Sequence, residues 1–147
     1  MNKLKKPGIG FIFLVVSFIG TLISLILFIS TYNVFKYELN RWAFSCLVLS
    51  LWGLLFLIVN NLIKGEHPFW QNIIYPIIAF LLVFSFTEFI NPCLSPIGIY
   101  FTVHNMGDTA TNDIGVPRSL ITCGFYLISI ISILVASFTK ASKEETK

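Results

Sequence analysis

The sequence predicts an all-α integral membrane protein, a four-transmembrane-helix bundle with a long outer loop between the third and fourth helices. Three observations lead to this prediction: four apolar runs, a composition poor in charge, and basic residues gathered at the ends of the runs. The hydrophobic fraction is 56% and the charged fraction 12%, whereas a soluble domain carries about 25% charged residues. Residues 1–147 are therefore expected to form a single membrane domain.

Each apolar run is close to the roughly 20 residues that a helix needs to cross a bilayer. The spans are expected at about residues 8–30, 42–63, 73–90 and 119–139. The first is interpreted as a retained signal-anchor helix, because its apolar stretch continues to Ile29 and no small-x-small cleavage pattern follows it. The third is the shortest, and Pro76 stands near its start, where proline is tolerated.

The distribution of basic residues predicts the orientation, because cytoplasmic loops carry an excess of Lys and Arg. One side of the predicted bundle holds seven: Lys3, Lys5, Lys6, Lys64, Lys140, Lys143 and Lys147. The other side holds three: Lys36, Arg41 and Arg118. We therefore expect a multi-pass protein of the plasma membrane with both termini in the cytoplasm.

The third connection, residues 91–118, is the most informative anomaly, because loops longer than about 12–15 residues tend to be functional. Its apolar part, 97–103, is expected to form a short strand, an interfacial helix or a re-entrant piece. Its second part, 108–113, is rich in carboxylates, hydroxyls and an amide. The candidate recognition cluster in and beside this loop is Glu88, His104, Asp108, Asp113 and Arg118.

Three interpretations of this cluster remain open. His104, Asp108 and Asp113 could hold a metal ion, since Ca²⁺ binds carboxylate and carbonyl oxygens, but no EF-hand, H-x-x-x-H or C-x-x-C spacing is present. The same residues could cap turns locally. Arg118 could instead pair with Glu88 or Asp113. His104 has no spaced partner that would make it a base, and we therefore predict no catalytic residue. Since the usual metal-binding spacings are missing, we also predict no metal and no cofactor.

The cysteines are all expected in the outer third of the membrane. Cys46 and Cys123 lie a few residues inside their spans, and Cys93 opens the loop. We expect free thiols packed as small apolar side chains. A disulfide from Cys93 to Cys46 or Cys123 is the alternative if the outer compartment is oxidising.

The topology, the Lys/Asn/Ile/Phe-rich composition and the outer Gly107-Asp108 resemble the small four-span membrane proteins of unknown function found in low-GC Gram-positive bacteria. This resemblance covers the whole chain and implies a fold but no activity.

These observations favour a non-enzymatic accessory or interaction protein, such as a subunit of a membrane assembly or an immunity-type protector, that recognises its partner through the outer loop. Its partners are expected to be the lipid bilayer and another membrane protein or a second copy. No nucleic acid is expected, because the basic residues form no patch. The alternative is a small transporter or channel subunit, for which the spans offer hydroxyls such as Ser50, Ser85 and Ser132, and Asn60 and Asn61 near the inner end.

Overall fold

Four long helices make up the computed structural model, which describes residues 8–36, 38, 40–64, 69–102 and 109–139. The helices are α1 (Ile9–Phe35), α2 (Arg41–Lys64), α3 (Phe69–Thr102) and α4 (Thr109–Phe138). All four are long and apolar enough to cross a membrane. The prediction of an all-α protein with four candidate spans is confirmed.

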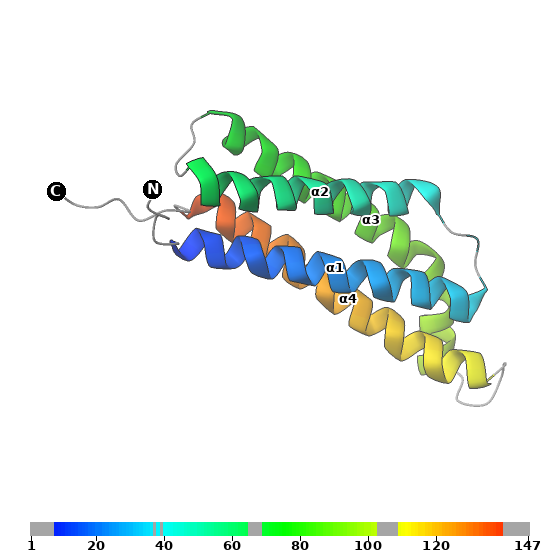
Figure 1. Cartoon of the computed structure of the whole chain (residues 1–147). Helices are drawn as coiled ribbons and strands as arrows, with labels where there is room; N and C mark the ends of the chain where they lie inside the picture. Colours follow the sequence, from blue (N-terminus) through cyan, green and yellow to red (C-terminus); the bar gives the residue numbers. More distant parts are fainter. Residues whose placement is uncertain (1–7, 37, 39, 65–68, 103–108, 140–147) are drawn as a thin grey trace.

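The helices run alternately up and down, and each packs against the next along the chain (Figure 1). Helix α4 closes the bundle by packing along α1, and the contact between these two helices is the most extensive in the bundle. The first turn of α1 and the last turn of α4 therefore lie at one end of the bundle. The opposite end, which we call the far end, holds the connection from α1 to α2, the last turns of α3 and the first turns of α4.

Helices α1 and α4 approach closely because small side chains line their contact. A methyl group added at Gly20 would lie 2.5 Å from the Oγ atom of Ser129. The Ser17 hydroxyl donates a hydrogen bond across the same contact to the Ser129 carbonyl oxygen, at 2.9 Å. Apolar burial does not drive association between helices in lipid, so close packing and hydroxyl bonds of this kind hold membrane bundles together.

An aromatic cluster fills the bundle interior toward the far end. Phe28 stacks on Tyr32 with ring centroids 4.6 Å apart. Phe89 of α3 lies 5.5 Å from Phe28 and 5.8 Å from Tyr126 of α4. The Tyr126 hydroxyl shares a 2.9 Å hydrogen bond with Ser85, whose own hydroxyl contacts the Ala43 carbonyl oxygen of α2 at 2.9 Å. The cluster therefore joins all four helices.

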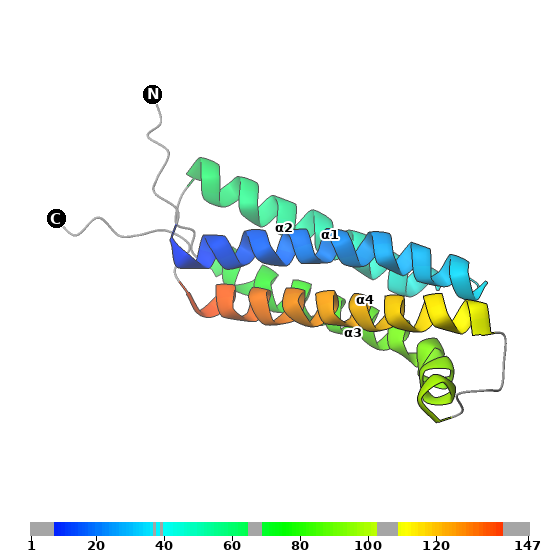
Figure 2. The same cartoon turned by 90° about the horizontal axis from the view of Figure 1, so that it is seen from below.

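The helix that carries the third expected span does not end near residue 90. Helix α3 continues to Thr102 and is 34 residues long, about 51 Å. Its interior contains Pro92 and Pro96, and Figure 2 shows the segment that holds them bending away from the line of the helix. Proline removes a backbone donor and kinks a helix, but membrane helices tolerate it where neighbouring groups satisfy the freed carbonyls.

The prediction that residues 91–118 form an outer loop is consequently wrong for most of this range. Residues 91–102 belong to α3, and the apolar part from 97 to 102 continues this helix rather than forming a strand or a re-entrant piece. Residues 109–118 are the first turns of α4. Gly115 and Val116 are buried there, and a methyl group added at Gly115 would lie 2.5 Å from the Phe35 ring. Packing against α1 thus outweighs the turn-forming preference of this sequence.

The three cysteines are free thiols in the structure. Cys93 is fully buried among the residues of the core, next to the bend in α3, whereas Cys46 and Cys123 are partly buried. Cys93 thus packs as a small apolar side chain.

Candidate functional site

Glu88 lies on α3 at the far end, one turn before the bend, and is partly buried. Its Oε2 atom accepts a hydrogen bond from the Asn40 side-chain amide at 2.7 Å. Pro92 stands four residues later and has no N–H, so the Glu88 carbonyl oxygen also lacks its usual intrahelical donor. The bend therefore coincides with the one acidic side chain of this helix.

Asn40 donates to this carboxylate and also stands directly before the first residue of α2. Its Oδ1 atom accepts hydrogen bonds from the backbone N–H groups of Trp42, at 3.1 Å, and Ala43, at 3.3 Å. This is the geometry of an N-cap, in which a side-chain oxygen satisfies donors of the first turn. Because Oδ1 faces the helix, the amide nitrogen is left to donate to Glu88. One side chain thus caps α2 and joins it to α3.

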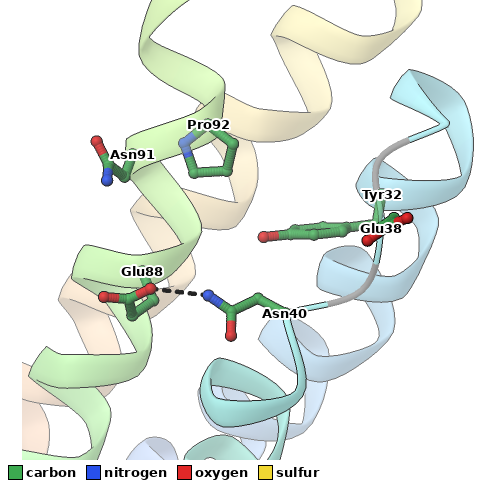
Figure 3. A pocket seen from close by; sticks show the side chains of 6 residues that line it. All are labelled: Tyr32, Glu38, Asn40, Glu88, Asn91 and Pro92. Carbon is green, nitrogen blue, oxygen red and sulfur yellow. Dashed lines mark hydrogen bonds between the residues drawn. The ribbon is translucent and has the colours of Figure 1, made fainter.

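A pocket of about 440 Å³ opens beside this hydrogen bond. We call it the Glu88 pocket; its lining residues are Tyr32, Glu38, Asn40, Glu88, Asn91 and Pro92. Figure 3 shows the hydroxyl end of Tyr32 directed toward α3. Tyr32 is only 3% exposed because Phe28 and Phe89 hold its ring. The pocket therefore has one aromatic wall, and Glu88 and Asn91 of α3 lie across from it (Figure 3).

The electrostatic character of the pocket is negative. The described residues that line it include two carboxylates, Glu38 and Glu88, and no cationic side chain. Lys36 and Arg41 flank the connection from α1 to α2 and are exposed. Within the part of the chain that the structure describes, neither forms an ion pair with a pocket carboxylate. Carboxylate oxygens and a phenol can bind an ammonium or guanidinium group by hydrogen bonds and charge.

Of the predicted recognition cluster, the structure describes Glu88, Asp113 and Arg118, and no ion pair joins these three. Arg118 donates from Nη1 to the Ser30 hydroxyl at 2.6 Å and so joins α4 to α1. Asp113 is exposed in α4. Neither of the expected ion pairs of Arg118, with Glu88 or with Asp113, is present among the described residues. His104 and Asp108 lie outside the described residues, so the metal and turn-capping interpretations that include them stay predictions.

Sequence reasoning found Glu88 but missed the other residues of the pocket. Asn40 carried a usable signal, because an asparagine directly before an apolar helix is a typical N-cap. Asn91 and Pro92 share a face of α3 with Glu88, but the sequence analysis assigned them to a loop. Tyr32 carried no signal that pointed to a site, because only the folded bundle brings the end of α1 to the same pocket.

No protein family, no curated protein and no solved structure matches this chain.

Proposed function

We propose that this protein is a non-enzymatic integral membrane accessory or interaction protein that recognises its partner through the Glu88 pocket. A subunit of a larger membrane assembly or an immunity-type protector fits this description. The observation that carries the proposal is the Glu88 carboxylate, which is partly buried at the end of a membrane bundle, opens to a pocket and has no cationic partner among the described residues.

The chemistry of the pocket indicates the kind of partner. Ionisable groups at membrane depth are costly and usually pair with an opposite charge. Asn40 supplies one neutral hydrogen bond to Glu88. Among the described residues no further donor uses the acceptor capacity of this carboxylate. An Arg or Lys side chain at the membrane boundary of another protein would supply the missing charge. Arginine fits best, because its planar fork can bind a carboxylate through two bonds.

We place the protein in the plasma membrane with both termini in the cytoplasm and the Glu88 pocket on the outer face. The basis is the seven-to-three distribution of basic residues between the two sides. The partner would accordingly present its basic side chain at the outer boundary of the same membrane.

A small transporter or channel subunit is the second candidate, because hydroxyl side chains are buried throughout the bundle. They are Ser17, Thr21, Ser24, Thr31, Ser50, Ser85, Ser119, Thr122, Ser129 and Ser132. Several of them, including Thr21, Ser119 and Ser129, donate to backbone carbonyls of their own helix. The close approach of α1 and α4 at Gly20 leaves no room for a permeating ion there. Helix packing therefore accounts for these hydroxyls better than a pathway does.

Glu88→Gln tests the proposal, because glutamine keeps the shape of the side chain and its bond from Asn40 but removes the charge. We expect this variant to insert and unfold like the wild type, and to be lost from the complex that the wild-type protein forms in native membranes. The measurement is the size and composition of that complex after extraction in mild detergent.

Asp113→Asn is the matched control, because it also removes one negative charge but lies on α4 at an exposed position outside the pocket. It should leave the complex intact. If Glu88→Gln assembles as well as Asp113→Asn and the wild type do, the pocket is not the recognition site.

A further inference from the structure

The exposed face of α2 differs from the exposed face of α1. Its residues recur at alternating spacings of three and four, and all are exposed. We call this face the α2 seam; it consists of Trp42, Ser45, Leu49, Trp52, Phe56, Val59 and Ile63. The corresponding face of α1 carries aliphatic side chains through its whole apolar length: Ile9, Ile12, Val16, Ile19, Leu22, Ile26 and Ile29. The α1 face needs nothing but lipid beside it.

Trp52 is the residue of the seam that is least suited to contact with lipid. It stands at the middle of the candidate span Arg41–Ile63 and is 67% exposed. Tryptophan is favoured at the two membrane boundaries, where its indole N–H reaches water or headgroups. The middle of a bilayer has no acceptor to offer. Within the described part of the chain, no side chain or carbonyl accepts a hydrogen bond from Trp52.

We propose that the α2 seam is a docking face for a transmembrane helix of another membrane protein. This helix would supply a hydroxyl or carboxamide acceptor to the Trp52 indole and small residues opposite Trp52 and Phe56. The inference rests on the proposed role as an interaction protein, though not on the Glu88 pocket. It names a second surface, at mid-membrane depth, by which the partner is held.

The bulk of the seam indicates small residues on the partner. Helices in lipid approach closely where one side is small, and the central stretch of the seam, Leu49, Trp52 and Phe56, is uniformly large. A second copy of this chain fits poorly for the same reason. In a two-fold dimer along the seam, residues of equal depth would meet, so Trp52 would face large apolar side chains and its N–H would remain unpaired.

A photo-cross-linking amino acid in place of Phe56, in the full chain and in native membranes, tests this docking face. Leu22 at the middle of α1 is the matched control, since it is also exposed at mid-depth. We expect the adduct at position 56 to map, by peptide mass spectrometry, to an apolar span of another protein that carries small residues and a polar side chain. Position 22 should give lipid adducts.

Trp52→Phe, introduced beside the cross-linker, removes only the indole donor and should lower the adduct yield about three- to tenfold, the range expected for one hydrogen bond between membrane helices. Lipid adducts alone at position 56, cross-links between copies of this chain, equal protein yields at positions 56 and 22, or a yield unchanged by Trp52→Phe would each overturn the inference. An adduct at position 56 that persists in Glu88→Gln would uphold the seam even where the pocket proposal fails.

Discussion

At the residue scale, Asn40 both caps the start of its own helix, α2, and bonds to a side chain of another helix, α3. Its side-chain oxygen satisfies two backbone donors at the start of α2, and its nitrogen donates to Glu88, 48 positions later in the chain. A carboxamide carries its acceptor and its donors on two separate atoms, so it can serve both partners at once. The two roles can therefore be separated by substitution.

Asn40→Ala should lower the free energy of unfolding by about 0.5–2 kcal/mol through the lost cap, whereas Asn40→Ser should retain most of the cap and lose only the bond to Glu88. Asn40→Asp caps as well as asparagine does but places a second carboxylate beside Glu88. We expect Asn40→Asp to be less stable than the wild type at neutral pH, because like charges at this distance repel. The measurement is denaturant unfolding in detergent micelles, followed by circular dichroism.

Adding Glu88→Gln to Asn40→Asp should restore stability, since one carboxylate and one amide then face each other again. Equal stability of Asn40→Asp and the wild type would show that the contact between Asn40 and Glu88 is not maintained in solution.

At the element scale, the contact between α1 and α4 determines where α4 begins. Gly115 stands in the part of α4 that was expected to be loop, and its lack of a side chain admits the Phe35 ring at the end of α1. The Arg118–Ser30 hydrogen bond lies close by on the same pair of helices. These contacts hold the first turns of α4 in helical form against α1.

Gly115→Ala should therefore destabilise the protein by about 1–3 kcal/mol, the usual effect of overpacking, because its methyl group would meet three atoms of the Phe35 ring at 2.5–2.9 Å. Gly124→Ala is the control on the same helix. Nothing lies within 4 Å of its added methyl group, and alanine favours a helix over glycine by up to about 1 kcal/mol. Thermal unfolding in micelles should rank Gly124→Ala at or above the wild type and Gly115→Ala below it. Two variants of equal stability would contradict the packing described at Phe35.

At the scale of the whole molecule, alternation of four spans places the start of α1 and the end of α4 at one end and the Glu88 pocket at the other. In the orientation that we propose from the distribution of Lys and Arg, the first of these ends faces the cytoplasm. In that orientation, a partner that uses the pocket would reach it from the side opposite the start of α1 and the end of α4.

A reporter fused at Lys147 should therefore indicate the cytoplasm, and a single cysteine introduced at Glu38 in a cysteine-free background should react with a membrane-impermeant reagent added from outside. Thr109, at the start of α4, should behave like Glu38. If positions 147 and 38 report the same side, the four-span arrangement is wrong. If position 147 reports the outside and position 38 the cytoplasm, the four-span arrangement stands and only the proposed orientation is wrong.

Sequence alone predicted an all-α chain with four apolar helices, because hydrophobic length is a local property that needs no knowledge of neighbours. It also singled out Glu88, since a lone carboxylate at the end of an apolar run is costly wherever the helix lies. The tertiary structure alone decided that α3 passes through Pro92 and Pro96 and that α4 begins at Thr109. It also decided that Glu88 accepts a hydrogen bond from Asn40 beside a pocket that Tyr32 lines. Proline and turn-forming residues end a helix by local preference, but packing against neighbouring helices can override that preference, and those neighbours come from distant parts of the chain.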